Sequence, residues 1–235
     1  EVLDDRVDGG LLVARLLDAG AIHPDHRRAC EQRPVAAGWT VGDVTVVTPQ
    51  LGGGVHDDGR VTVDDGSTPP LAGATVRLER NQGPGAARNA GRRMVTTQLI
   101  AFVDSDVELL DEEATAYGGS CWLDALLPHF DDPRVGLVAP RVLGDDHSSL
   151  DLGAEPARVR ANTRVGYVPA AAIVVRADAF DDVGGFDEGL RCGEDVDFVW
   201  RLDQAGWTCR FEPASAVWHR PRGSLAGRLR QQVGY

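Results

Sequence analysis

The stretch from Leu99 to Asp106 constrains the fold of this chain most strongly. Five apolar residues, Leu99-Ile100-Ala101-Phe102-Val103, are followed at once by Asp104-Ser105-Asp106. A parallel strand buried on both faces has such a continuous apolar run, and open α/β sheets bind ligands at the carboxyl ends of their strands. Carboxylate oxygens at that place suit Mg²⁺ or Mn²⁺. A solvated turn also favours Asp and Ser, so the tripeptide alone does not decide between a metal site and a turn.

Composition narrows the classes of protein to which the chain can belong. Its 235 residues are 43% hydrophobic, which is enough for the core of one large domain with an appendage. The net charge of −12 and the pI of about 4.9 argue against a nucleic-acid partner, because such proteins usually present a basic face. All 24 basic residues are Arg, which excludes Schiff-base chemistry and a Walker-type phosphate-binding lysine.

Cysteine spacing and hydropathy indicate the compartment. The four cysteines are scattered without a C-x-x-C pair, which predicts reduced thiols and no disulfide. No apolar run reaches the roughly 18–20 residues that span a bilayer, and no signal peptide precedes Glu1. We therefore expect a cytoplasmic chain without a transmembrane segment, either free or peripherally associated with the inner face of the membrane. The absence of an initiator Met is typical of a piece of a longer protein.

Residues 1–40 and 41–235 differ in their sequence patterns. Residues 1–40 are predicted to form a small helical N-terminal appendage, part of a docking module, with one amphipathic helix over 10–20. His23-Pro24-Asp25-His26 follows that helix and resembles a metal-binding pair, but no third ligand is evident and we interpret it as a turn. Residues 41–235 alternate between strand and helix patterns, which is typical of an α/β domain with a mixed, mostly parallel sheet and flanking helices.

Periodicity predicts the elements of this α/β domain. Strands are expected over 44–49, 60–67, 75–78, 99–103, 134–142, 168–175 and 208–218, and helices over 83–91, 121–130 and 194–205. The last helix is predicted to bury Val196, Val199, Trp200 and Leu202, and the helix before it Trp122, Leu123, Leu126 and Leu127. Polar loops are expected over 111–119 and 145–163, the latter as a lid or acceptor loop.

Three acidic clusters fall at strand ends or at a helix start: Asp64-Asp65, Asp104 with Asp106, and Glu194-Asp195. Each has a simpler explanation, since the first is also typical of a turn and the last of acids that complement a helix dipole. His219 is likewise typical of a histidine at a strand end. With Arg88 near a helix start, however, the clusters supply a residue for every part of a site for a metal ion and a diphosphate.

These motifs carry a resemblance to a known family. It rests on Val63-Asp64-Asp65-Gly66-Ser67, on residues 81–91 around Gly83-Pro84-Gly85-Ala86-Ala87-Arg88-Asn89, on Phe102 to Asp106, on Gly184-Gly185-Phe186-Asp187-Glu188, and on Gly193-Glu194-Asp195 with the helix to Leu202. In this order they are similar to the motifs of family two inverting glycosyltransferases with the GT-A fold, over about residues 43 to 222. The resemblance implies a Rossmann-like domain that binds a nucleotide diphospho-sugar.

The resemblance also implies roles for single residues. Asp65, with Asp64 as the fallback, would bind the uracil of a UDP-sugar, and Pro49 would lie beside the base. Arg88 would contact the nucleotide and Asp104 the ribose near the metal. Asp106 and His219 would ligate Mn²⁺ or Mg²⁺. Asp195 would be the general base that deprotonates an acceptor hydroxyl, with Glu194 as a further substrate-binding residue and Trp218 lining the site.

The implied reaction transfers a hexose, with glucose the first candidate, from the UDP-sugar to a small-molecule or peptide-derived acceptor such as a redox cofactor precursor. One departure is that the glycine-rich segment 50–59 replaces the helix that the family usually has after its first strand. Loss of this helix would expose a sheet face beside the nucleotide. It would also affect the role of Pro49, which directly precedes the segment. A catalytically impaired nucleotide-sugar or partner-binding domain is therefore one alternative. A nucleotidyltransferase, which can share the fold and the Asp-x-Asp site, is the other.

Overall fold

The computed structural model describes residues 10–24, 38–56, 58–110, 122–144 and 150–220. The strands of this part are β1 (Val44–Gln50), β2 (Val61–Asp65), β3 (Val76–Leu78), β4 (Leu99–Val103), β5 (Val107–Leu109), β6 (Val135–Leu143), β7 (Ala157–Val159), β8 (Ala172–Arg176) and β9 (Thr208–His219). Its helices are α1 (Gly10–Asp18), α3 (Pro84–Arg92), α4 (Ala177–Asp182) and α5 (Glu194–Gln204), with the 3-10 helices η1 (Val41–Asp43) and η2 (Leu127–Asp131).

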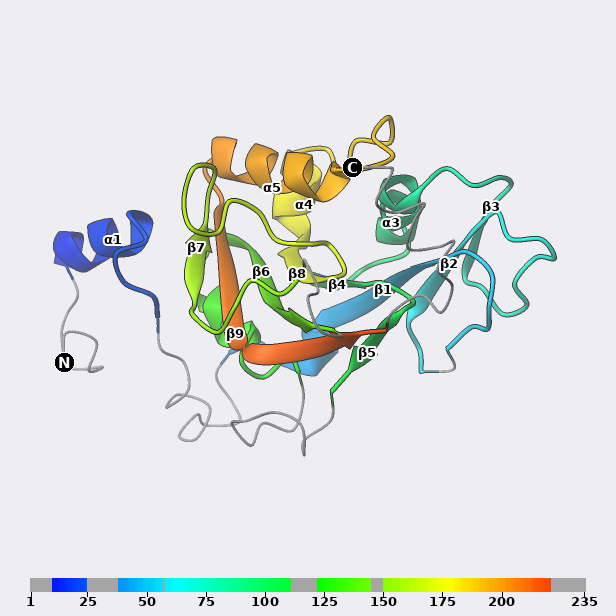
Figure 1. Ribbon diagram of the computed structural model, residues 1–235, viewed down its shortest axis with the longest axis horizontal. Coiled ribbons are helices and arrows are strands. Elements are labelled where there is room, and N and C mark those ends of the chain that lie inside the picture. Colours follow the sequence, from blue (N-terminus) through cyan, green and yellow to red (C-terminus); the bar gives the residue numbers. More distant parts are fainter. Residues whose placement is uncertain (1–9, 25–37, 57, 111–121, 145–149, 221–235) are drawn as a thin grey trace.

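Within the described residues the strands form one sheet in the order β3-β2-β1-β4-β8-β6-β9-β5, and β7 pairs with β9 (Figure 1). β1 is parallel to β2 and to β4, whereas β8 runs antiparallel to β4 and β6. This arrangement confirms the predicted mixed, mostly parallel sheet. β1 lies between β2 and β4, so the strand order reverses there, and α/β sheets form their ligand crevice at such a switch point.

β4 is the most deeply buried strand near this switch point. All five of its residues are 0% exposed. Leu99, Ala101 and Val103 belong to one apolar core, and Ile100 and Phe102 to the other, as the alternation of strand side chains requires. The prediction of a strand that is buried on both faces is confirmed.

The two cores cover opposite faces of the sheet. One core packs helices α3, α4 and α5 on the sheet, and these helices lie on the same side of it in Figure 1. Its aromatic centre is Phe102, Phe180, Phe186 and Phe198, with Phe186 and Phe198 stacked at 4.4 Å between ring centroids. The other core packs the segment that leads into η2 against the opposite face. Both faces of the central strands are therefore closed to water.

Two details of the predicted helices are wrong. The described part of 121–130 contains turns and the 3-10 helix η2 instead of an α-helix, because Pro128 lacks a backbone N–H and disfavours the helical conformation of the residue before it. Its predicted apolar residues are nevertheless buried. In α5, Trp200 is 43% exposed instead of buried, and its Nε1 donates to Gly166 O at 3.0 Å. Phe198 occupies the core in its place.

The predicted loss of a helix between β1 and β2 is confirmed for the described residues of this connection, which form bends and irregular backbone. The neighbouring sheet face is nevertheless closed at Thr48, Thr62 and Asp64, which are 0% exposed. Asp64 accepts hydrogen bonds from the backbone N–H groups of Ser67 (2.8 Å) and Leu71 (3.1 Å) and pairs with Arg77. A polar network from the loop after β2 thus covers the face on which we expected exposure.

The predicted N-terminal helix is present as α1, which lies beside the β7 end of the sheet (Figure 1). Its last residue, Asp18, accepts a hydrogen bond from Arg134 Nη1 at 3.1 Å, and its carbonyl oxygen accepts one from Arg158. Residues 1–9 and 25–37 lie outside the described residues, as do the predicted loop 111–119 and residues 145–149 of the predicted acceptor loop. The docking role of residues 1–40 stays a prediction.

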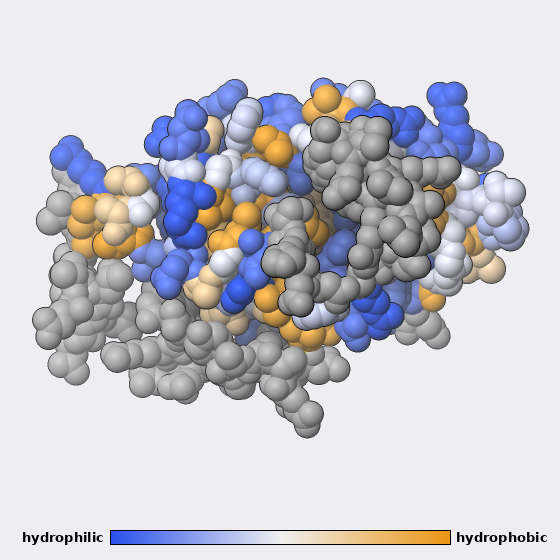
Figure 2. Space-filling view, viewed as in Figure 1, coloured by the Kyte–Doolittle hydropathy of each residue, from blue (hydrophilic) through white to orange (hydrophobic). Residues whose placement is uncertain are grey.

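On the face shown in Figure 2, hydrophilic residues cover much of the described surface and hydrophobic residues form separate groups between them. Large exposed hydrophobic side chains include Leu51, Met94 and Trp200. None of the helices in the described ranges has both the length and the apolar character needed to cross a bilayer.

Close packing of α3 on β1 and β2 makes Gly91 a test of the fold. A Cβ at this position would lie 2.3 Å from Val47 Cγ1 and 3.1 Å from Val63 Cγ2. We therefore expect Gly91→Ala to lower the free energy of unfolding by about 1–3 kcal/mol through overpacking, measured by urea denaturation. Gly54→Ala, where a Cβ meets nothing within 4 Å, is the control and should change it much less. Equal effects of the two changes would contradict this account of the packing.

Candidate active site

A cavity of about 780 Å³ opens at the carboxyl ends of β1, β2 and β4. Its lining combines residues from eight segments of the chain: Pro49, Gln50, Leu51, Asp65, Asn81, Gly83, Pro84, Arg88, Asp104, Ser105, Asp106, Leu150, Pro169, Ala170, Ala171, Arg191, Cys192, Gly193, Glu194, Asp195 and His219. Eight of the nine residues predicted for the site are among them. The structure therefore brings together acids that are up to 130 positions apart in the sequence, from Asp65 to Asp195.

Asp65 lies at the end of β2 and is 5% exposed. Its two carboxylate oxygens accept hydrogen bonds from the backbone N–H groups of Gln82 (2.7 Å) and Gly83 (2.9 Å). Gly66 makes this approach possible, because a Cβ there would lie 2.3 Å from Arg80 C and Asn81 N, and its φ of 76° is a conformation that favours glycine. The Asp65-Gly66 turn thus fixes the backbone that enters α3.

The fallback residue Asp64 does not face the cavity. Neighbouring side chains of a strand point to opposite faces, so Asp64 lies on the far side of β2 from Asp65. Burial would raise the pKa of the Asp64 carboxyl, but hydrogen bonds from Ser67, Leu71 and Arg77 outweigh it and hold the pKa at about 2. The structure therefore assigns Asp64 to the cover of the sheet rather than to the pocket.

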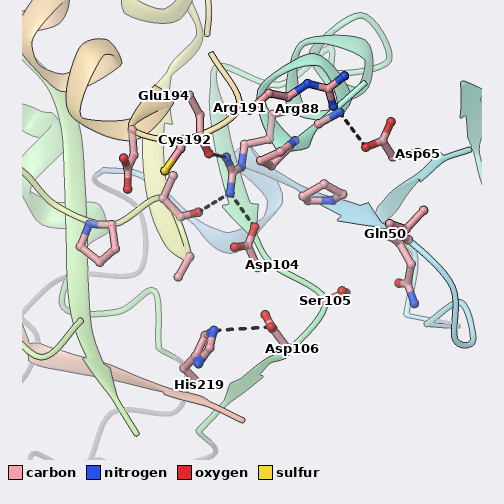
Figure 3. Close-up of a pocket in the computed structure, with 18 of the residues that line it drawn as sticks. Gln50, Asp65, Arg88, Asp104, Ser105, Asp106, Arg191, Cys192, Glu194 and His219 are labelled. Atoms are coloured by element: carbon pink, nitrogen blue, oxygen red, sulfur yellow. Dashed lines mark hydrogen bonds and ion pairs between the residues drawn. The ribbon is translucent and has the colours of Figure 1, made fainter. Parts of the chain in front are cut away.

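Arg88 is the central cation of the cavity (Figure 3). Its side chain is 2% exposed, and Nη2 donates to Asp104 Oδ1 at 2.7 Å and to Ala170 O at 3.2 Å. Nη1 donates to Glu194 Oε1 at 3.1 Å, and the guanidinium lies 5.2 Å from the centroid of the Phe186 ring. One buried guanidinium therefore joins β4, the segment before β8 and the start of α5.

Two acids near Arg88, Asp104 and Asp195, have raised pKa values. Burial raises the pKa of the Asp104 carboxyl, and although Arg88 opposes this effect, Asp106 and Glu194 add to it. Burial also raises the pKa of Asp195, and the charge of Glu194 raises it further. Asp195 Oδ1 accepts a hydrogen bond from its neighbour's backbone N–H, that of Val196, at 2.8 Å. A carboxylate with a raised pKa is a better proton acceptor, which suits Asp195 to act as a base.

Asp106 and His219 form the part of the cavity that could hold a metal ion. His219 Nε2 lies 3.5 Å from Asp106 Oδ2, and both side chains are 19% exposed (Figure 3). β5 and β9 pair antiparallel with Val107 opposite His219, which holds the two residues together. A carboxylate oxygen and an imidazole nitrogen are both ligands of divalent first-row ions, so the donor set fits such an ion.

Of two residues predicted to lie at the site, the structure places one in the lining of the cavity and not the other. Pro49 lines the cavity, although the connection that follows it is shortened. Trp218 is not among the lining residues, because side chains alternate along β9 and His219 is the one that faces the cavity. Sequence reasoning missed Arg191, which lines the cavity and donates from Nη1 to Asn81 Oδ1 at 3.0 Å. The sequence signal that could have identified Arg191 is its position, two residues before the Gly193-Glu194 motif.

Comparisons with solved structures agree with this fold. The crystal structure of S. aureus TarS superposes with a TM-score of 0.58 at 18% identity, over 76% of this chain and 36% of that one. GalNAc-T7, solved with UDP, GalNAc and Mn²⁺, gives a TM-score of 0.52 at 17% identity, over 76% of this chain and 44% of that one. The fold is thus that of the GT-A glycosyltransferases.

Sequence comparisons identify the family. Residues 61–149 match the model of Glycosyl transferase family 2. The chain is 40% identical over 251 aligned residues to the pre-mycofactocin glycosyltransferase of Mycobacterium tuberculosis (strain H37Rv), covering 94% of this chain and 50% of that protein. It is 30% identical over 195 residues to the succinoglycan biosynthesis protein ExoO of Rhizobium meliloti, covering 72% and 54%. The chain belongs to glycosyltransferase family 2 and spans about half the length of these two relatives.

Arg88 provides the test of the site's electrostatics. Arg88→Gln leaves the buried Glu194 and the half-buried Asp104 without their cation, and breaking a buried ion pair costs about 3 kcal/mol or more. We expect this loss in the free energy of unfolding at pH 7 by urea denaturation. Arg191→Gln removes an exposed guanidinium from the same cavity and should change stability by less than about 0.5 kcal/mol. Equal stability of the two variants would refute the central place of Arg88.

Proposed function

We propose that this chain transfers a hexose from a UDP-sugar to an acceptor hydroxyl, with inversion at the anomeric carbon and with a divalent ion bound. The observation that carries the proposal is the convergence of its acids, Arg88 and His219 on one cavity at the switch point of the sheet. Solved TarS structures contain UDP and UDP-GlcNAc, which supports a UDP-sugar as the donor. Glucose is the hexose that we propose first.

Residues at the ends of β1 and β2 would hold the nucleotide. Asp65 would accept a hydrogen bond from uracil through lone pairs that its two backbone donors leave, and Pro49 would lie beside the base. Arg88, which lines the cavity, would contact the nucleotide. Asp104 would lie beside the ribose. Arg88 would also keep the acids around it ionised and in place.

Asp106 and His219 would hold Mn²⁺ or Mg²⁺. The mixed oxygen and nitrogen donor set favours Mn²⁺, since Mg²⁺ prefers oxygen ligands alone. When bound, such an ion neutralises charge on the diphosphate leaving group. A lysine cannot neutralise this charge instead, because the chain contains no lysine.

Asp195 would act as the base at the acceptor side of the cavity. Its carboxylate accepts the proton of the acceptor hydroxyl as that oxygen attacks the anomeric carbon, and it requires hydrogen-bond reach of about 2.6–3.2 Å. Glu194, held by Arg88, would position the acceptor or the sugar beside it. The relative named for pre-mycofactocin supports a peptide-derived redox cofactor precursor as the acceptor. Action in the cytoplasm or at the inner face of the membrane belongs to the same proposal.

A second candidate is a domain that binds nucleotide sugars without transferring them. The observation that favours it is the connection between β1 and β2, whose described residues contain no helix. Incubation with a panel of UDP- and GDP-sugars, Mn²⁺ and candidate acceptors separates the two functions. UDP release with a glycosylated product, followed by mass spectrometry, supports transfer, whereas UDP binding without product supports the binding domain.

The role of Asp195 is tested by Asp195→Asn. The amide cannot accept the hydroxyl proton, so we expect the rate of sugar transfer to fall at least about a hundredfold while UDP binding with Mn²⁺ is kept. Asp197→Asn is the matched control on the same helix, because Asp197 pairs with Arg201 at 2.6 Å and does not line the cavity. Unchanged transfer by the Asp195 variant would refute its role as the base.

The role of His219 is tested by His219→Ala. Loss of a ligand should weaken the Mn²⁺-dependent binding of UDP at least about tenfold, because even groups that only orient ligands cost that much. Calorimetric titration of UDP with Mn²⁺, and again with a chelator, measures the effect. His56→Ala removes an exposed histidine outside the cavity and should leave the titration unaltered. An unaltered titration of the His219 variant would reject this ligand.

A further inference from the structure

Three side chains converge at a second place, away from the active-site cavity. They are His23, which follows α1, His129 of η2 and Glu212 of β9. Glu212 Oε2 lies 3.4 Å from His23 Nε2 and 3.2 Å from His129 Nε2, and the ligand atoms of all three lie within 4.8 Å of one another. None of the three lines the active-site cavity.

This cluster is buried and incompletely satisfied. The side chains of His23, His129 and Glu212 are 13%, 0% and 8% exposed. His23 Nε2 is inaccessible to water and makes no hydrogen bond of good geometry among the described residues, although Glu212 Oε2 faces it. A buried polar atom without a hydrogen bond is costly, so a bound cation between these atoms would remove an existing penalty.

The spacing of the three atoms fits a small transition-metal ion. Ligand atoms about 2.0–2.2 Å from a tetrahedral ion lie roughly 3.3–3.6 Å apart, close to the two observed separations from Glu212 Oε2. Two imidazoles with one carboxylate suit Zn²⁺ and similar ions better than Mg²⁺ or Ca²⁺. Burial would raise the pKa of Glu212, but the hydrogen bond from His129 and the nearby imidazole of His23 lower it below its usual range.

We propose that His23, His129 and Glu212 bind a zinc-like transition-metal ion, which joins the segment after α1 to η2 and β9. Three protein ligands leave a fourth position of a tetrahedral ion for water. The site would be structural, since its ligands come from three separate segments and none faces the active-site cavity. It is distinct from the Asp106 and His219 pair.

Arg210 decides how protons move when the ion binds. Arg210 Nη1 lies 3.2 Å from His129 Nδ1 and donates to it, so without metal the ring proton is on Nε2 and is donated to Glu212. An ion bound at Nε2 would require the proton on Nδ1 instead, so the hydrogen bond from Arg210 Nη1 to Nδ1 would have to break. Arg210 then keeps its pairing with Asp132, whose Oδ2 lies 3.2 Å from Nη2. Because protons and the ion compete for the same imidazole nitrogens, binding of the ion depends on pH.

The test titrates Zn²⁺ into chelator-treated, dialysed protein. The His219→Ala variant serves as the background, so that the proposed catalytic ion does not contribute a histidine ligand. We expect one equivalent of Zn²⁺ to bind and to raise the melting temperature. Adding His23→Gln should weaken the binding at least about tenfold and abolish the rise, because a ligand is lost. His23 is the ligand to replace, because it is the most exposed of the three and its substitution should disturb the fold least.

His56→Gln in the same background is the matched control and should bind Zn²⁺ like the parent. Circular dichroism checks that all variants are folded. Co²⁺ titration with visible spectroscopy reports whether the bound ion is tetrahedral. Equal Zn²⁺ affinity of the His23 and His56 variants would overturn the proposal, and so would a folded parent that binds no Zn²⁺. Neither result depends on glycosyl transfer.

Discussion

The buried guanidinium of Arg88 is the interaction on which the site depends. Asp104 follows β4 and Glu194 begins α5, and placing a half-buried and a buried carboxylate so close together would be costly without a cation between them. Arg88 satisfies both and also donates to Ala170 O, which precedes β8. The same contact therefore closes the fold around the cavity and opposes the rise that burial causes in the pKa of Asp104. Stability and the proposed chemistry depend on one residue.

The sheet order explains why the acids meet where they do. β1 lies between β2 and β4, and the carboxyl ends of all three strands open onto the cavity. The connection from β1 to β2 contains no helix in its described part, yet the fold tolerates this loss because Asp64 collects backbone donors and Arg77 on that face. The neighbouring acids of Asp64-Asp65 thus act on opposite faces. One supports the sheet and the other lines the cavity.

Much of the fold could be predicted because its signals are local. The apolar run of β4 and the helix that begins at Gly83-Pro84 are both present as predicted. The errors concern the surroundings of a side chain, which local pattern does not encode. Trp200 is apolar but lies at the surface with its indole N–H bonded to Gly166 O. Trp218 is not among the residues that line the cavity, whereas its neighbour His219 is.

By itself, the sequence determined the family motifs, the α/β class and the residues that carry charge, since these follow from residue type and spacing. Only the tertiary structure decided which charges meet. It separated Asp64 from Asp65, buried Arg88 between two acids and added Arg191 to the cavity. It also gave His23 the partners that its own neighbourhood lacks, 106 and 189 positions further along the chain at His129 and Glu212. Contacts between such distant residues depend on the path of the whole chain, and no local pattern specifies that path.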